Sequence, residues 1–465
     1  MEYDKRKELG QMFLEYFNNK DLENALKCIN ELIELCPEES EYYNNRGILY
    51  EFLRKYDKAL EDYAKVIEIN PNFIEAYNNR GNLYVDLRRY KEAESDYNKV
   101  IEINPNDTQT YYNRGNLFLN LGKYEEALKD YTKAIEINPN YVEAYNNRGT
   151  LYSNLERYEE ALEDYEKAIK LNPNYVEFYY NRGNLFLNLG KKEEALKDYT
   201  KAIEINPNYL QAYYNRSILY ADLGKYEEAL KDYNEVIKLS PNFSQAYNNR
   251  GTLYSNLERY EEALKDYNKA IKLNPNNLQV YNNRGNLYSK LGKYKKALKD
   301  YNKAIKLNPN FSQVYNNRGV LYSKLGKYEE ALKDCNKAIE INPNHIEAYN
   351  NKAILYLYLL ENEQEKIKYI KYFIENKDKL YIDTFEKFLF KVNDRNNFDN
   401  ELLDKILELN KIYMESINKN LHNKVASLKN EDLKNNLYKL YSISEEILNI
   451  NKFTFNIDNK DHHFY

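Results

Sequence analysis

Apolar and polar residues follow one another along most of the chain in a pattern that returns every 34 residues. The segment from Val142 to Tyr175 is one copy of this pattern. Its large or apolar side chains are Tyr145, Leu151, Tyr152 and Leu155, followed by Tyr158, Ala161, Leu162, Tyr165, Ala168, Ile169 and Leu171. Spacings of three, four and seven residues are typical of helices with one apolar face. The pattern therefore predicts two amphipathic helices in each copy.

Helix-ending residues separate the two halves of each copy and the copies themselves. The first break is predicted near Glu156, where five sister copies carry glycine, the residue preferred just after a helix C-terminus. Pro173 ends the second helix, because proline cannot continue a helix and disfavours helical geometry at the residue before it. Each copy is thus predicted to be a helical hairpin.

Nine close copies of the hairpin run from Ser40 to His345. When Val142 is counted as position 1, every copy has arginine at position 7: Arg46, Arg80, Arg114, Arg148, Arg182, Arg216, Arg250, Arg284 and Arg318. A chain with this regularity is an array in which each unit contacts its neighbours, rather than a set of separate globular domains.

The repeated unit resembles the tetratricopeptide repeat. That family's pattern asks for aromatic residues at positions 4, 11 and 24, glycine at 8, alanine at 20 and 27, and proline at 32. The matching residues here are Tyr145, Tyr152, Tyr165, Gly149, Ala161, Ala168 and Pro173. The resemblance implies an all-α fold, a right-handed α-solenoid of stacked helical hairpins in which the first helices line a concave groove. Arginine at position 7 departs from the family, where an apolar residue is usual.

The fit to the pattern divides the chain into four predicted segments. Residues 6–39 are a degenerate N-terminal capping repeat, and residues 40–345 are the nine close repeats. Residues 346–379 are a degenerate closing repeat. Residues 380–465 have lost the repeat phase, but their apolar residues keep helical spacing, so they are predicted to be a C-terminal extension with extra helices.

Composition narrows the classes of function. Charged residues make up 30% of the chain and nearly balance, with a net charge of -5, so no basic field is present to attract nucleic acid. Three cysteines are too few for a disulfide framework and are expected to be reduced. No run of apolar residues is long enough to span a membrane, so we expect no membrane partner and a cytoplasmic location. Nothing in the sequence fixes the oligomeric state.

Residues with the spacing of a catalytic, metal or cofactor site are not found. Of the four histidines, only His462 and His463 are adjacent in the sequence. With Asp461 they suggest a metal site, but a solvated chain end is the better interpretation, since a frayed terminus supplies no ligand geometry. No glycine-rich segment matches a phosphate-binding motif. The sequence therefore predicts a non-enzymatic protein without a cofactor or metal.

An aspartate lies sixteen residues after every arginine of the series: Asp62, Asp96, Asp130, Asp164, Asp198, Asp232, Asp266, Asp300 and Asp334. Positions 7 and 23 of an antiparallel hairpin lie at similar heights, so each pair is within reach of a charge-assisted contact. One hypothesis is that nine Arg-Asp pairs stiffen the array. The alternative is that duplication of one ancestral unit carried both residues along.

Position 6 is asparagine in ten successive units: Asn45, Asn79, Asn113, Asn147, Asn181, Asn215, Asn249, Asn283, Asn317 and Asn351. The family resemblance implies that positions 2, 5, 6, 9, 12 and 13 line the concave face. A primary amide offers both a donor and an acceptor, which suits a peptide backbone. The series is similar to the asparagine ladder of O-linked N-acetylglucosamine transferases, and this implies a grip on extended polypeptides. Inheritance by duplication explains the series equally well.

The leading hypothesis is a protein-protein interaction scaffold that binds an extended peptide segment of a partner. Selectivity would come from breaks in the pattern, such as tyrosine at position 5 or Lys290 and Lys324 at position 13. The family's clamp for C-terminal carboxylates needs lysine at position 5, where this chain has asparagine or tyrosine, so that mode is disfavoured. The alternative hypothesis is a targeting or regulatory subunit for a separately encoded enzyme such as a glycosyltransferase.

Overall fold

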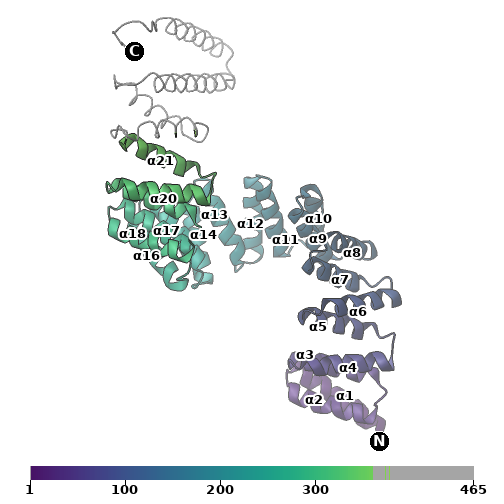
Figure 1. Cartoon of the computed structure of the whole chain (residues 1–465). Coiled ribbons are helices and arrows are strands. Elements are labelled where there is room, and N and C mark those ends of the chain that lie inside the picture. Colours follow the sequence, from purple (N-terminus) through teal and green to yellow (C-terminus); the bar gives the residue numbers. More distant parts are fainter. Residues whose placement is uncertain (1, 360–371, 373–375, 377–465) are drawn as a thin grey trace, which may run out of the picture. The chain divides into compact units, whose positions relative to one another are not determined.

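The computed structural model describes residues 2–359 together with residues 372 and 376, and every element in this part of the chain is an α-helix (Figure 1). The first helices of the hairpins are α1 (Glu2–Asn18), α3 (Ser40–Phe52), α5 (Ile74–Asp86), α7 (Thr108–Asn120), α9 (Val142–Asn154), α11 (Val176–Asn188), α13 (Leu210–Asp222), α15 (Ser244–Asn256), α17 (Leu278–Lys290), α19 (Ser312–Lys324) and α21 (Ile346–Leu359). The second helices are α2 (Leu22–Leu35), α4 (Tyr56–Ile69), α6 (Tyr90–Ile103), α8 (Tyr124–Ile137), α10 (Tyr158–Leu171), α12 (Lys192–Ile205), α14 (Tyr226–Leu239), α16 (Tyr260–Leu273), α18 (Tyr294–Leu307) and α20 (Tyr328–Ile341).

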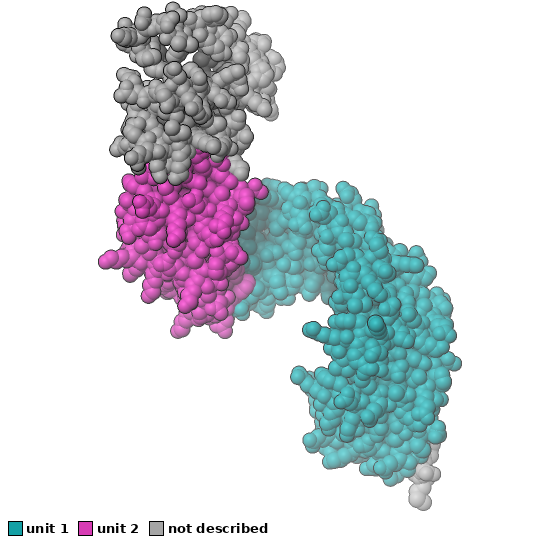
Figure 2. Space-filling view, in the orientation of Figure 1, with its two compact units in different colours: residues 1–240 teal, residues 241–465 magenta. Residues whose placement is uncertain are grey.

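The helices stack in chain order. Each first helix packs against the second helix of its own hairpin, and each second helix packs against the next first helix in the same unit. First helices of neighbouring hairpins also contact one another, as α5 does with α7 and α17 with α19. The chain forms two compact units, residues 1–240 and residues 241–465, which Figure 2 shows in teal and magenta. The predicted all-α solenoid of helical hairpins is confirmed.

The turn inside each hairpin has the geometry that the sequence predicts. Glu156 has a φ of 61° and Gly122 a φ of 70°, so position 15 lies in the left-handed region that favours glycine. The N–H of Arg157 then donates to the carbonyl of Tyr152 at 2.9 Å, and this bond satisfies a carbonyl that the end of the first helix leaves open. The predicted break between the helices is confirmed.

The turn between hairpins follows the proline. Helix α10 ends at Leu171, two residues before Pro173. The side-chain oxygen of Asn172 accepts a hydrogen bond of 3.3 Å from the N–H of Asn174, which closes a tight turn around the proline. The next first helix begins two residues later, at Val176.

The core of each hairpin is built on an alanine, a glycine and a tyrosine. Ala93 and Tyr97 of α6 are 0% and 1% exposed. A Cβ added to Gly81 of α5 would lie 2.8 Å from the ring of Tyr97, closer than carbon atoms pack. Glycine at position 8 therefore makes room for the tyrosine at position 24, and the two helices approach closely around this ring.

The end of the array is described in part. Helix α21 is the first helix of the predicted closing repeat, and its Ala353 and Leu355 are buried. Apart from residues 372 and 376, the rest of that repeat lies outside the described residues. So do the predicted helices of residues 380–465 and the Asp461-His462-His463 group. None of the described helices has the length and apolar character needed to cross a membrane.

Candidate functional site

The arginines at position 7 pair with the aspartates at position 23, as hypothesised. Arg148 donates to Asp164 through Nε at 2.8 Å and through Nη2 at 2.7 Å, which is a bidentate contact. All nine pairs have this geometry, with bonds of 2.7 to 2.8 Å. Asp164 is buried and the Arg148 side chain is 15% exposed, so the pair is largely shielded from water and is not the exposed contact of little value that surface ion pairs usually are.

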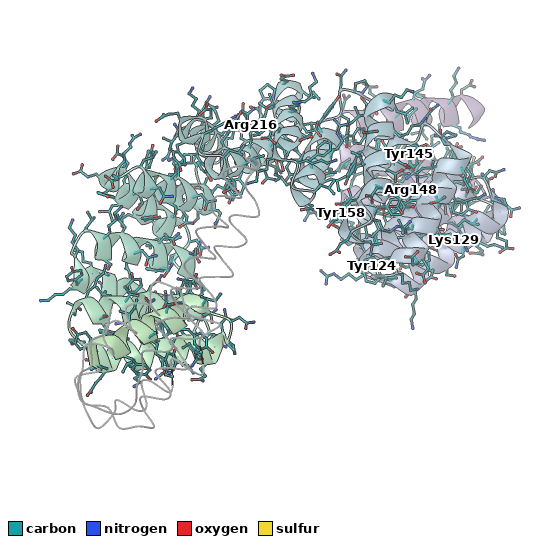
Figure 3. The ribbon with its side chains drawn as sticks, turned by 90° about the horizontal axis from the view of Figure 1, so that it is seen from above. Tyr124, Lys129, Tyr145, Arg148, Tyr158 and Arg216 are labelled. Carbon is teal, nitrogen blue, oxygen red and sulfur yellow. The ribbon has the colours of Figure 1, made fainter. Side chains whose placement is uncertain are left out.

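Most of these arginines also donate to the preceding hairpin. Nη1 of Arg148 donates to Thr132 Oγ1 at 2.9 Å, and Nη1 of Arg114 donates to Asn98 Oδ1 at 2.6 Å. The guanidinium of Arg148 lies 5.8 Å from the ring centre of Tyr145 (Figure 3). It lies at the same distance from the ring centre of Tyr152. One side chain thus joins two helices of its own repeat and one of the repeat before, a role that the sequence did not reveal.

The arginines at position 7 keep their positive charge in the folded array. Burial of Arg148 opposes its positive charge, but the hydrogen bonds and the negative charge of Asp164 more than offset burial and raise the pKa of Arg148. The same balance raises the pKa of Arg114 and of Arg284. With their donors committed inside the stack, these arginines hold the array together and are not free to bind a phosphate or a carboxylate from outside.

The ten asparagines at position 6 are all half-buried. Most of these asparagines donate a hydrogen bond from Nδ2 to the side chain at position 5 or position 9 of the preceding repeat. Asn181, for example, donates to Asn146 Oδ1 at 2.9 Å, and Asn317 donates to Asn282 Oδ1 at 2.8 Å. Equivalent bonds are made by Asn79, Asn113, Asn147, Asn215, Asn283 and Asn351. The ladder therefore forms a line of hydrogen bonds that runs from repeat to repeat.

Several ladder oxygens are occupied as well. Gln109 donates to Asn113 Oδ1 at 2.8 Å, and Gln313 donates to Asn317 Oδ1 at 3.1 Å. Asn147, Asn249 and Asn283 also accept bonds from neighbouring side chains. Much of the hydrogen-bonding capacity of these amides is therefore used inside the array, by the oxygens within one repeat and by the Nδ2 groups between repeats.

Asparagines at position 9 are the residues that sequence analysis missed. Oδ1 of Asn116 accepts from the hydroxyl of buried Tyr131 at 2.7 Å and from Asn147 Nδ2 at 3.0 Å, and Asn82 and Asn184 have the same two kinds of partner. Nδ2 of these three residues makes no hydrogen bond within the described part of the chain. Their N–H groups lie on the same helical face as position 6, three residues away. We call this surface, positions 2, 5, 6, 9, 12 and 13 of the first helices, the ladder face.

A signal for position 9 was present in the sequence. Where position 9 is not asparagine, threonine can take its internal role: Thr252 Oγ1 accepts from Tyr267 at 3.2 Å, and Thr150 Oγ1 lies 3.0 Å from the Tyr165 hydroxyl. In these repeats position 9 thus provides the polar partner that a buried tyrosine hydroxyl at position 24 requires, whereas Tyr63, whose repeat has Ile48 at position 9, bonds to Glu51. The recurrence of asparagine or threonine at position 9 together with tyrosine at position 24 could have predicted this hydrogen bond.

Tyrosines interrupt the ladder face in unit 1. The ring of Tyr112 at position 5 packs edge-on against Tyr141 with 5.2 Å between ring centres, and Tyr180 packs in the same way against Tyr209 at 5.4 Å. The Tyr112 hydroxyl accepts from Asn147 at 3.0 Å, in place of the asparagine found at position 5 elsewhere. The hydrogen-bond line therefore continues through the hydroxyls of these rings.

A pocket of about 240 Å³ opens on the ladder face of unit 2. Its lining comes from α17, α18 and α19: Asn286, Ser289, Lys290, Tyr301, Asn317, Val320 and Lys324. It brings ladder residue Asn317 together with the two lysines that the sequence singled out.

A larger hollow of about 560 Å³ lies in unit 1, between α7, α8 and α9. Its wall contains the Arg114–Asp130 pair. Lys133 and Glu136, also in the wall, pair with each other at 3.2 Å. Lys129 of this hollow is labelled in Figure 3. Because its charges are mixed and largely paired, this hollow does not select a ligand of one charge.

The described residues contain no group of three or more His, Cys, Asp and Glu that could hold a metal ion. Within the same residues, the three cysteines are free thiols; Cys28 and Cys335 are buried, and Cys36 is half-buried. Burial raises the pKa of Cys335 to about 12, so its thiol stays protonated at neutral pH.

Comparison with family models places the repeats. A model described as tetratricopeptide repeat matches residues 40–73, 74–107, 108–141, 142–175, 176–209, 244–277, 278–311 and 312–345. A second model of that description matches residues 198–231 and 335–368, and one described as TPR repeat matches residues 218–258. The first model omits the copy in which Ser217 replaces the glycine of position 8.

Similar chains are found among solved structures. MamA protein shares 28% identity, with a TM-score of 0.34, over 36% of this chain and 91% of that one. YrrB, described as a TPR protein with an unusual peptide-binding site, shares 28% identity, with a TM-score of 0.34. The match covers 40% of this chain and 95% of YrrB. A tetratricopeptide repeat protein from Parabacteroides merdae shares 23% identity, with a TM-score of 0.44, over 54% and 98%. No curated protein matches the chain.

Proposed function

Because this chain belongs to the tetratricopeptide repeat family, we propose that it is a non-enzymatic protein-interaction scaffold whose ladder face holds an extended segment of a partner polypeptide. The observation that carries the proposal is the set of side-chain amides at position 9, whose oxygens are fixed inside the stack while their N–H groups remain available. These donors match the carbonyl oxygens of a peptide backbone.

The ladder asparagines contribute in two ways. Asn113, Asn147 and Asn215 donate to the position 9 asparagines of the preceding repeats at 3.1, 3.0 and 2.9 Å, and so fix the direction of those amides. Asn181 and Asn317 keep a second Nδ2 hydrogen that no described residue accepts, because each makes one bond from Nδ2. Amides held in place before a ligand arrives lose little side-chain entropy on binding.

The spacing of the donors suits an extended chain. Neighbouring helices lie on the order of 8 to 10 Å apart, and an extended peptide advances about 3.3 to 3.6 Å per residue, so one repeat serves roughly every third residue. At about 1 kcal/mol for each hydrogen bond, about eight rungs approach the roughly 8 kcal/mol of micromolar binding before the cost of association is subtracted, so the amides alone give a weak grip. Backbone carbonyls are common to all residues, so the grip itself tolerates many sequences.

A random-sequence peptide display library tests the proposal. The library is passed over the immobilised full-length chain and over a support that carries none, and the recovered peptides are sequenced. We expect the chain to retain peptides of varied sequence with dissociation constants in the micromolar range or weaker. Recovery equal to that of the bare support would contradict a polypeptide-binding role for the ladder face.

A further inference from the structure

The pocket on the ladder face of unit 2 is small and polar. Its volume of about 240 Å³ is below the roughly 300 to 1,000 Å³ of pockets that hold whole small molecules, so it suits one side chain. Asn286 and Lys290 come from α17, and Asn317 and Lys324 come from the neighbouring α19. The pocket therefore lies across two repeats, in the path of a polypeptide that follows the ladder face.

Hydrogen-bond donors dominate this pocket. Lys290 and Lys324 supply two ammonium groups, and no aspartate or glutamate is part of the lining. The oxygen of Asn286 already accepts from the hydroxyl of Tyr301 at 2.8 Å, and its Nδ2 group has no acceptor among the described residues. Lys324 makes no ion pair with the described residues. Such a set of donors is complementary to a carboxylate.

The charge of the ladder face differs between repeats. Lys290 and Lys324 are the basic residues at its six positions in the nine close repeats. The copies in residues 40–243 carry acidic residues at these positions, namely Glu41, Glu51, Glu75, Asp86, Glu143, Glu177 and Asp222. The copies in residues 244–345 carry none. An acidic side chain of a partner is therefore repelled along the ladder face of unit 1 and attracted at this pocket.

One internal carboxylate competes for the pocket. Nζ of Lys290 lies 3.9 Å from Glu258, and the two side chains are 54% and 75% exposed. Lys290 also lies over the ring of Tyr260 at 5.0 Å. An exposed ion pair at that distance contributes little to stability, so an incoming carboxylate can replace Glu258 at small cost.

We propose that this lysine pocket receives the carboxylate of an aspartate or glutamate side chain in the bound polypeptide and so fixes which segment of the partner lies on the ladder face. The inference rests on the proposed function and adds its specificity: the amides hold the backbone, and the lysine pocket selects the register.

The test compares paired peptides. A peptide recovered by the full-length chain is synthesised with glutamate or with glutamine at its acidic position, and both dissociation constants are measured for wild type and for K290N/K324N. Asparagine is the replacement because sister copies carry Asn154 and Asn188 at this position and fold with it. The matched control is K299N/K333N, which removes the same charge from exposed positions of α18 and α20.

We expect wild type to prefer the glutamate peptide by about tenfold, which corresponds to two exposed ion pairs. K290N/K324N should lose this preference and still bind the glutamine peptide, whereas K299N/K333N should keep it. E258Q should bind the glutamate peptide more tightly than wild type does. Equal affinity of wild type for the two peptides, or an unchanged preference in K290N/K324N, overturns the lysine pocket alone. Failure of the chain to bind any library peptide overturns the proposed function as well.

Discussion

Arg182 donates two parallel hydrogen bonds of 2.8 Å to the carboxylate of Asp198, which lies sixteen residues later on the second helix of the same hairpin. Asp198 is 5% exposed, and the Arg182 side chain is 19% exposed. Removal of one partner leaves the other charge buried without compensation, which typically costs about 3 to 5 kcal/mol. The pair is thus a strong point of contact between the two helices of one repeat.

A double-mutant cycle measures this contact. We expect R182Q and D198N each to lower the free energy of unfolding by about 3 kcal/mol, and the double variant to lose at least about 1 kcal/mol less than the sum of the two. Chemical denaturation supplies the free energies. R182Q combined with D96N, which lies in another hairpin, is the control and should be additive. Additive losses in the R182Q/D198N cycle would contradict a direct pair.

Glycine at position 8 offers a test of core packing within unit 2. A Cβ on Gly285 would lie 2.7 Å from the ring of Tyr301, whereas a Cβ on Gly319 would lie 3.3 Å from the sulfur of Cys335. Overpacking costs about 1 to 3 kcal/mol, and alanine gains roughly 1 kcal/mol over glycine inside a helix. We therefore expect G285A to lower the free energy of unfolding by about 1 kcal/mol more than G319A does.

Thermal and chemical denaturation of the two alanine variants give the comparison. Both variants introduce the same methyl group at the same position of the repeat, so helix propensity cancels between them. Equal stability of G285A and G319A would show that the tyrosine ring yields freely and that the contact with Gly285 does not limit packing.

His345 makes the folding stability of unit 2 depend on pH. Its Nδ1 lies 2.8 Å from Ser312 Oγ, and its Nε2 is buried without a hydrogen-bond partner among the described residues. Burial lowers the pKa of His345 below its usual value of 6.5, against the opposing influence of Glu347. The unfolded chain therefore binds a proton more readily than the folded chain. The contribution of His345 to stability is complete above pH 6.5 and is lost as the pH falls toward the folded-state pKa.

The variant H345F places at this position the residue that a sister copy has at Phe311. We expect the free energy of unfolding to fall between about pH 7.5 and about pH 5.5 in wild type, and to fall less in H345F. The other three histidines are present in both proteins, so their effect cancels. An equal decrease in the free energy of unfolding of wild type and H345F would show that His345 does not cause the pH dependence.

Much of the fold could be predicted from the sequence because it depends on local rules. The turn at Glu156 and the end of α10 before Pro173 follow from backbone preferences. The Arg-Asp pairs follow from the height that positions 7 and 23 share in one hairpin.

Contacts between hairpins were harder to predict, because they depend on the offset of one repeat against the next. The third bond that most of the arginines make is an example. Arg148 finds Thr132 in the preceding repeat, whereas Arg80 faces Ala64 at that position and makes its two bonds to Asp96. The asparagine ladder was affected in the same way, since the Nδ2 groups of its amides donate across the repeat boundary.

The central claim, that free amide N–H groups on the ladder face hold a polypeptide backbone, is tested most directly by the affinity of one library-selected peptide for N82T/N116T/N184T. Threonine keeps the bond to the buried tyrosine, as Thr252 does with Tyr267, but removes the free amide. The control N140T/N174T/N208T makes the same change at exposed turn residues. We predict a dissociation constant at least about tenfold higher for the first variant, from three lost hydrogen bonds, and an unchanged value for the control. Equal affinity of wild type and N82T/N116T/N184T would contradict the claim.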